Sequence, residues 1–530
     1  MKLPAFLSGF RRKRTGPSQK ELSQFANDWA AKMQRVQRGY YDAARTPDDL
    51  AAYWANSDAF DADSANSKSV RQTLVQRSRY ELANNGYADG IAQTYSTDLV
   101  GVGPALRMQT NSPGFNQMVE LNWYLWCKAV NFRRKLWTMA HAKHGDGEAF
   151  AVLRRNKKIN NRIGLDVVLY ETEQCQSGYL GLNEPGRIDG IRFDEFGNPT
   201  HYEFLEQHPG SQNGYTLGTD TELVPANFVL HWFKMRRPGQ HRGVPECAST
   251  LNFGAVFRRG RNAQISTWEK IASWVLFLKT MFEPETAQPV TPLSTLDISS
   301  NMMTALPNTV EPVQLKAEHP GANYPEAHKM WLNEMGRPKN MPLNKVACNS
   351  SDYNYASGRL DHQTYYGNLD VDREDCNDQV LDPLFNAWFD AAVLTFGWLG
   401  GNPEAIGPAA RVHAWDWPKH RVADVESEAN ANRTKLESGQ TFPHLVFAEA
   451  GLDGDDEVAK AAVFYGVTEK EVRQRLFDVL LPAEVQAAKV SAPSPAKSLS
   501  TDEAISALFG ELDRRSALNS VNGKGAHHAN

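Results

Sequence analysis

Two long segments with helically spaced apolar residues constrain the fold of this chain more than any other feature. The first segment contains Phe253, Val256, Phe257, Ile265, Trp268, Ile271, Ala272 and Val275. The second contains Tyr366, Leu369, Cys376, Val380, Leu384 and Trp388. Steps of three, four or seven residues predict helices with one buried face. Because Pro383 removes a backbone donor inside the second pattern, we expect a kink near Leu381 or Asp382.

The rest of the chain mixes helical patterns with short β-rich runs. Further helices are expected on both sides of the turn dipeptide Asn85-Gly86 and at Gly114–Val130, Pro325–Met335, Val422–Leu436 and Asp455–Phe464. Strands are expected at Ala149–Arg154, Leu165–Glu171, Ile191–Phe193, Tyr202–Phe204, Phe228–Phe233 and Arg411–Trp417. Residues 283–322 contain six prolines and are expected to hold short strands at best. The sequence therefore predicts an α+β fold.

Composition narrows the class of protein. With 530 residues, 41% hydrophobic and 22% charged, the chain is typical of a soluble protein of several domains. A formal net charge of -5 argues against extensive clamping of nucleic-acid phosphates. The five cysteines are far apart and include no CxxC pair, which favours reduced thiols and synthesis in a cytosol. The strongest apolar run, Trp274–Leu278, is too short to span a membrane.

The stretch HAKHGDGEAF holds the most metal-like cluster of side chains. His141 and His144 share one helix face, and Asp146 and Glu148 follow them. Zinc requires three or four ligands that converge tetrahedrally. The intervening glycines favour a turn that moves the acids away, so a structural helix-turn-strand is the preferred interpretation. A metal-dependent hydrolase using these four residues stays open as an alternative.

A second candidate site is the polar stretch SDYNYASGRLDHQTYY, from Ser351 to Tyr366. Its serine, aspartate and histidine suggest a catalytic triad, but on a helix Asp361 and His362 point about 100° apart. Ser357, or Asn354, can instead accept hydrogen bonds from the first turn of the following helix. Asp361 near that end suits the helix dipole. We therefore expect a helix cap preceded by a solvated, base-poor loop.

Two phosphate-binding motifs can be assessed from the sequence. LVGVGPALR lacks the third glycine of a dinucleotide loop and follows a helix instead of a strand, so it predicts a glycine turn. The sequence contains no GxxxxGK[ST], the phosphate cradle of an ATP-driven motor. The chain is therefore not expected to be a motor itself.

Five segments together resemble the lambda-type family of tailed-phage portal proteins. They are ELANNGYADGIAQTYSTDLVGVG, HGDGEAF, RGVPECASTLNFGAVFRR, SDYNYASGR and the stretch HAWDWPKHRVADVESEANANRTKLESG with FAEAGLDGDD. They span about residues 70–460 in the order found in the family. The resemblance implies a portal fold of wing, stem, clip and crown, with two long helices and a β-rich wing, that assembles into a ring.

The resemblance also implies a division of the chain and a DNA-facing surface. The expected parts are an N-terminal arm at 1–70, wing at 71–247, stem helix at 248–282, clip at 283–322, second stem helix at 323–339, tunnel loop at 340–356, kinked wing helix at 357–397, wing and crown at 398–483, and a C-terminal tail at 484–530. The loop side chains expected to face DNA are Lys345, Asn349, Ser350, Ser351, Asp352, Tyr353, Asn354 and Tyr355.

The resemblance further implies a structural role without catalysis, cofactor or metal. Expected partners are eleven further copies in a dodecamer, double-stranded DNA bound without sequence specificity, terminase, head–tail adaptors, and major capsid and scaffolding proteins. No membrane partner is expected, and the location would be the portal vertex of the virion after synthesis in the host cytoplasm. Another head–tail connector or a minor capsid protein stays open as an alternative in the same class.

Overall fold

The computed structural model describes most of the central part of the chain. The described residues are 23–24, 26–28, 48–176, 186–211, 221–272, 276–280, 310–314, 323–351, 354–420, 425–449 and 454–480. Predictions for most of residues 1–47, for most of 283–322 and for 484–530 lie outside them. The chain divides into two compact units, Met1–Ser67 with Arg237–Gln240, and Lys68–Arg236 with His241–Asn530. Among the described residues, no helix is long and apolar enough to cross a membrane.

The smaller unit contains two short helices, α2 (Ala51–Trp54) and α3 (Ala62–Ala65). Asp61 precedes α3 in an extended conformation, and its carboxylate accepts a hydrogen bond from the amide of Ser64. A carboxylate at this position satisfies one of the free amides of the first turn.

Four helices begin the larger unit. Helices α4 (Lys68–Asn84) and α5 (Gly86–Val100) are separated at Asn85, whose side chain accepts a hydrogen bond from the amide of Tyr87. This confirms the predicted break. Helices α6 (Pro113–Ala129) and α7 (Phe132–Asp146) follow and bury Trp123 and Trp126 in the main core. Helix α7 ends where Gly147 adopts a left-handed conformation, which glycine does without steric cost.

Two antiparallel sheets follow in the chain. One has the order β3-β2-β8, from Leu165–Tyr170, Glu148–Arg155 and Val229–Phe233. The other has the order β4-β5-β6-β7, from Arg187–Ile188, Ile191–Phe193, Pro199–Leu205 and Thr221–Pro225. Phe150 and Val152 of β2 pack with Tyr202 and Phe204 of β6 in a second core. The predicted strands are confirmed, whereas the short β4 and β7 were not expected.

A third antiparallel pair joins segments that are far apart in the sequence. Strand β1 (Ala105–Met108) pairs with β11 (His413–Asp416), and Leu106 lies opposite Trp415. The glycine turn predicted before β1 is confirmed, because Gly101 and Gly103 both have positive φ angles, of 54° and 97°. The strand expected at Arg411–Trp417 is confirmed as β11.

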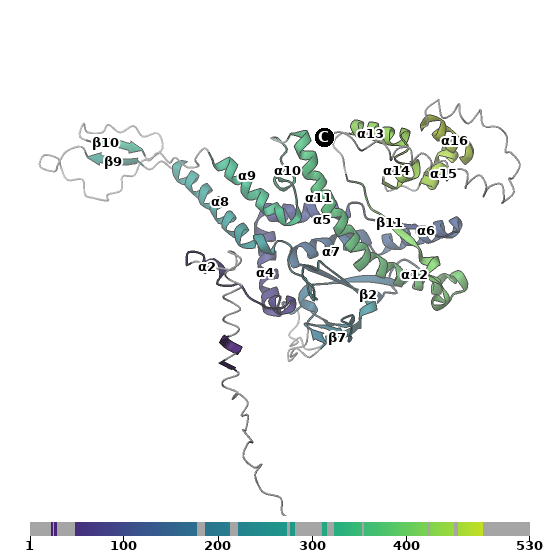
Figure 1. The fold of residues 1–530 in the computed structure, drawn as a ribbon, viewed down its shortest axis with the longest axis horizontal. Helices are drawn as coiled ribbons and strands as arrows, with labels where there is room; N and C mark the ends of the chain where they lie inside the picture. The colour runs from purple at the N-terminus through teal and green to yellow at the C-terminus, as the bar shows by residue number, and fades with distance from the viewer. Residues whose placement is uncertain are drawn as a thin grey trace, which may run out of the picture. The chain divides into compact units, whose positions relative to one another are not determined.

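The first long helical pattern is shorter than expected. Helix α8 covers Leu251–Ala272, and residues Leu276–Thr280 form strand β9, which pairs with β10 (Val310–Gln314). The expectation of a stem helix over residues 248–282 is therefore wrong at its C-terminal end. The run Leu-Phe-Leu-Lys-Thr is compatible with a strand, and its partner lies 30 residues away, beyond the reach of local periodicity. Helix α9 (Tyr324–Gly336) runs alongside α8 (Figure 1).

The second long pattern is confirmed as helix, and a π-helical turn lies where the kink was expected. Helix α11 (Tyr355–Cys376) passes through a π-helical turn at Asn377–Leu381 into α12 (Asp382–Phe396). Pro383 is the second residue of α12 and cannot donate to the preceding turn, which explains why the irregularity lies there. The buried residues of α12 include Leu384, Trp388 and Phe389.

Four helices end the described part of the chain: α13 (Val425–Glu437), α14 (Pro443–Glu449), α15 (Gly454–Tyr465) and α16 (Glu469–Leu480). Helices α13 and α15 confirm the predictions for 422–436 and 455–464. Helices α14 and α16 were not expected. Taken together, the described elements form an α+β protein, as predicted.

Candidate functional site: the loop before α11 and a buried polar junction

The loop before α11 is shorter than the predicted segment 340–356. Helix α10 (Leu343–Ala347) occupies part of that segment, and Cys348 ends it in a left-handed conformation with a φ of 50°. The amide of Asn349 donates to the carbonyl of Asn344 at 3.0 Å. The carboxamide of Asn349 in turn accepts from the amide and the hydroxyl of Ser351, at 3.0 and 2.6 Å. These local bonds fix the exposed start of the loop.

Lys345, the basic residue of the predicted DNA-facing set, is neutralised within the protein. Its ammonium lies 2.6 Å from a carboxylate oxygen of Asp98 on α5. The hydroxyl of Tyr365 donates to the same oxygen at 3.0 Å. The ammonium also lies 5.0 Å from the centroid of the Tyr365 ring. Burial and the neighbouring Asp98 raise the pKa of Tyr365, so this phenol stays protonated. Lys345 therefore anchors α10 and offers little free charge to a polyanion.

A second contact attaches α10 to α11. The carboxamide of Asn344 lies 3.0 Å from the imidazole Nε2 of His362. Partial burial, with a contribution from Lys345, lowers the pKa of His362. His362 is therefore neutral at physiological pH and can accept this bond.

The structure describes only some of the remaining residues that were predicted to form the loop and the helix cap. Asp352 and Tyr353 lie outside the described residues, as does the side chain of Tyr355. Ser350 is exposed. Ser357 is the third residue of α11, and its hydroxyl donates to the carbonyl of Asn354 at 3.2 Å. The prediction of Ser357 as the cap residue is therefore wrong, and its alternative Asn354 occupies the position before the helix. Asp361 is exposed in the second turn.

A buried ionic junction connects α7, α11 and the segments before α8 and α10. The ammonium of Lys143 lies 2.9 Å from Glu246 and 3.6 Å from Asp372. Lys339 contacts the same two carboxylates, and Lys234 lies 2.9 Å from Asp372. Burial alone would raise the pKa of Asp372, but the three lysines lower it. The carboxylate is therefore ionised and is shared by three lysine side chains.

Tyr95 of α5 completes this junction. Its hydroxyl donates to Asp372 at 2.9 Å, and its ring lies 3.5 Å from the ammonium of Lys339. Burial, followed by the proximity of Lys143, lowers the pKa of Lys339 well below its usual range. A buried cation of this kind is retained only where carboxylates and π-faces surround it.

A second buried pair joins β2 to the segment before α8. The guanidinium of Arg242 donates to Glu148 through Nε and Nη2, with distances of 3.0 and 2.7 Å to the carboxylate oxygens. The amide of Gly243 donates to Glu148 at 2.8 Å, and the imidazole of His231 lies 3.2 Å away. The hydroxyl of Thr172 also donates to Glu148. All lone pairs of this buried carboxylate are therefore used in structural bonds.

The backbone around Gly147, between α7 and β2, also packs directly against the backbone around Gly243, before α8. A Cβ atom on Gly147 would lie 2.2 Å from the carbonyl carbon of Val244, and one on Gly243 would lie 2.2 Å from the carbonyl oxygen of Gly147. The amide of Glu246 donates to the carbonyl of His144 at 3.1 Å. The stretches HGDGEAF and RGVPE are therefore two halves of one packed unit.

The hydrolase alternative requires four side chains to converge on one metal ion: His141, His144, Asp146 and Glu148. The structure gives several of them other partners. Two Arg79 nitrogens hold Asp146 at 2.8 Å each, and Arg242 holds Glu148. His141 stacks on a tryptophan of its own helix, with ring centroids 5.3 Å apart. These groups therefore do not form the metal site that the alternative requires.

Sequence reasoning missed the ionic junction, although one signal for it was present. Lys143 follows Leu136, Met139 and Ala140 at helical spacing, on the face that α7 buries. A lysine at a buried helix position needs a paired acid. The distant partners Glu246 and Asp372 could not be found from local spacing.

Comparison with known proteins shows to which protein family the chain belongs. A sequence model of the family described as phage portal protein, lambda family, matches residues 49–372, more than half of the chain. The chain belongs to this family. It is a phage portal protein. A curated relative, a probable portal protein of Halomonas phage phiHAP-1, is 21% identical over 441 residues, covering 76% of this chain and 82% of the relative.

Two solved structures have a limited likeness to this portal protein. A chain from the virion of a native gene transfer agent particle is 10% identical, with a TM-score of 0.39, covering 72% of this chain and 93% of the other. An HK97 family phage portal protein from Corynebacterium diphtheriae is 12% identical, with a TM-score of 0.24, covering 56% and 85%. The family assignment of the portal protein rests on the sequence match.

Proposed function

We propose that this portal protein assembles into a dodecameric ring at the portal vertex of the virion, with a central channel for double-stranded DNA. In this role it nucleates the procapsid and contacts terminase, head–tail adaptors, and the major capsid and scaffolding proteins. It is made in the host cytoplasm and performs no catalysis. Support comes from the family match and from a sequence without the phosphate cradle of an ATP-driven motor.

The observation that carries the DNA-facing part of this proposal is the charge balance of the loop before α11. Residues 340–354 include one basic residue, Lys345, and Asp98 neutralises it at 2.6 Å. Duplex DNA carries about one charge per 1.7 Å of its axis, and each lysine or arginine that binds a phosphate adds salt-dependent affinity. A polar loop without free cations lets DNA slide past because it makes few such contacts.

The ring is tested by electron microscopy of the purified full-length protein. Rings with a central hole and twelve-fold symmetry are expected. The proposal would be contradicted if the purified protein stayed monomeric at high concentration and if procapsids assembled with capsid and scaffolding proteins also contained no ring.

The loop is tested by replacing residues 349–354 with a Gly/Ser sequence of the same length. Ring formation and procapsid assembly should persist, because the described residues Asn349, Ser350, Ser351 and Asn354 are exposed. DNA packaging or retention should fall. A matched control replaces an exposed turn away from this segment, residues 194–198 between β5 and β6. Equal DNA filling in the loop variant and the control would refute the role of the loop.

The charge argument has its own test in Asp98→Asn. This change removes the carboxylate that pairs with Lys345, so a cation becomes free beside the loop. Rings of the variant should bind duplex DNA more tightly, with a steeper dependence on salt. Asp89→Asn, on the same helix and paired with Gln93, is the control. Identical salt dependence for wild type and both variants would show that the neutralisation of Lys345 is irrelevant to DNA.

A further inference from the structure

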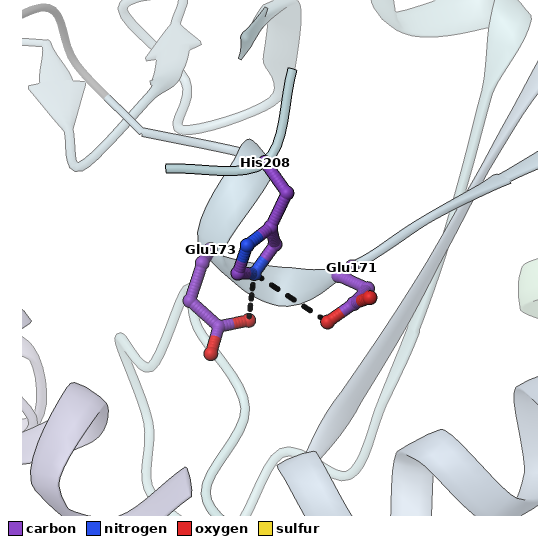
Figure 2. Close-up of side chains that lie close together, drawn as sticks. All are labelled: Glu171, Glu173 and His208. Carbon is purple, nitrogen blue, oxygen red and sulfur yellow. Dashed lines mark ion pairs between the residues drawn. The ribbon is translucent and has the colours of Figure 1, made fainter. Parts of the chain in front are cut away.

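A cluster of two carboxylates and one imidazole lies where β3 ends and β6 ends. Glu171 follows β3, Glu173 lies in the 3₁₀ turn Thr172–Gln174, and His208 follows β6. Figure 2 shows one ring nitrogen of His208 facing both carboxylates. This Nε2 lies 3.5 Å from an oxygen of Glu171 and 3.6 Å from an oxygen of Glu173. The three ligand atoms all lie within 4.8 Å of one another.

These distances fit a metal shell better than hydrogen bonds. An N–H···O bond spans about 2.7–3.2 Å, and the buried Nε2 of His208 has no hydrogen-bond partner among the described residues. Tetrahedral zinc with bonds of about 2.0–2.2 Å places neighbouring ligand atoms about 3.3–3.6 Å apart. The two measured separations fall within or at the edge of that range.

The local backbone holds the ligands in place. Glu171 precedes the 3₁₀ turn, and its amide donates to the side chain of Gln174 at 3.1 Å in a reciprocal capping box. The 3₁₀ turn therefore sets the positions of both glutamates. His208 comes from a different sheet than β3, so a shared ion would link the two sheets.

The charge of the surroundings also favours a cation. Asp146, Glu171 and Glu173 carry three negative charges, and Arg79, which contacts all three, supplies one positive charge. Burial and the neighbouring carboxylates of Glu173 and Glu171 raise the pKa of Asp146 despite Arg79. These four side chains together carry a net charge of -2, which a divalent ion would neutralise.

We propose that Glu171, Glu173 and His208 bind one Zn²⁺ ion. Arg79 then orients the ligating carboxylates from outside the metal shell, a role that hydrogen-bond donors commonly have around metal sites. The side chain of Glu171 is 56% exposed, so water can reach the fourth position. The ion joins the sheet that contains β3 to the sheet that contains β6 and has a structural role.

One existing hydrogen bond must change when zinc binds. The amide of Gly210 donates to Nδ1 of His208 at 3.0 Å, which places the proton of the neutral ring on Nε2. Zinc at Nε2 requires that proton on Nδ1. Because the Gly210 bond is exposed, both groups can bond to water instead, and the net loss is small.

The test measures zinc directly. Full-length protein is freed of metal with a chelator and titrated with ZnCl₂ by calorimetry, and the metal retained after dialysis is measured by mass spectrometry. One zinc ion per chain is expected. His208→Ala should weaken binding by more than about tenfold, and Glu171→Gln should weaken it as well. His201→Ala and Glu195→Gln are matched controls outside the cluster and should bind like wild type.

A second readout separates ligation from simple stabilisation. Cobalt(II) in place of zinc should give the visible absorption of a four-coordinate ion in wild type, and His208→Ala should lose it. Absence of stoichiometric zinc in wild type would overturn the proposal. Equal binding by wild type and His208→Ala would place the ion elsewhere and overturn it too.

Discussion

Replacing Arg242 with methionine should destabilise the protein by about 3–5 kcal/mol, the usual cost of removing one partner from a buried ion pair. The Arg242 side chain is 2% exposed and that of Glu148 is fully buried. The change leaves Glu148 without its main counter-charge. It also removes a donor from three backbone carbonyls, those of Cys175, Asp189 and Thr172. Since whole domains are stable by about 5–15 kcal/mol, the loss should be plain in an unfolding curve.

The assay is urea unfolding followed by tryptophan fluorescence at fixed protein concentration. Arg433→Met is the control, because that side chain is 73% exposed and its pair with Glu437 is worth less than about 0.5 kcal/mol. A loss below about 1 kcal/mol for Arg242→Met would refute the reasoning. Restoration of stability by an apolar replacement of Glu148 in the same chain would support it, because no charge would then be buried alone.

The same pair predicts a dependence on pH. Burial alone would raise the pKa of Glu148, but Arg242 and then His231 lower it well below the ordinary 4.5. A lowered folded pKa contributes stability that is present above about pH 4.5 and is lost as pH falls through the folded pKa. The difference between wild type and Arg242→Met should therefore be largest near neutral pH and should narrow below 4.5. A difference that stays constant into acid would contradict this.

Three further substitutions test other parts of the fold by the same unfolding assay. Gly147→Ala should destabilise the protein more than Gly439→Ala, because both glycines have a positive φ but only a Cβ at Gly147 would clash with backbone. Gly439→Ala should cost only about 1–2 kcal/mol. Equal losses would refute the close packing of Gly147 against Val244. Asn85→Ala should cost about 1 kcal/mol as the cap of α5, whereas the exposed Asn84→Ala should cost less than about 0.5; equal costs would exclude the capping role. Asp372→Asn should cost about 3 kcal/mol or more, because three lysines lose their shared carboxylate, and a neutral effect would show that the junction is hydrated.

Elements with a strong local pattern were predictable from the sequence. The break at Asn85, the end of α7 at Gly147 and the helix irregularity before Pro383 each follow from the conformational preferences of a single residue. The end of α8 was not predictable in this way, because strand β9 depends on pairing with the distant β10. Pairing of segments far apart in the chain leaves no local signature.

The candidate site was predictable only in outline. A polar, base-poor loop before a long helix could be read from residues 349–357, but the neutralisation of Lys345 depends on Asp98, 247 positions earlier. The cluster of Glu171, Glu173 and His208 was not predictable for the same reason, because segments from two different sheets bring its members together. Side-chain chemistry is visible in a sequence, whereas the partner of each side chain depends on tertiary structure.

The π-helical turn at Asn377–Leu381 has an evolutionary consequence. A π turn holds one residue more than an α turn, so it corresponds to a single-residue insertion that the helix has absorbed. Val380 and Leu381 are adjacent in sequence and both fully buried, a pairing that accommodates the extra residue. Loss of one codon within this turn could therefore restore a regular helix, whereas the same loss in α12 would rotate every later side chain by about 100°. Length variation among relatives should be tolerated at this turn and rejected in the helices on either side.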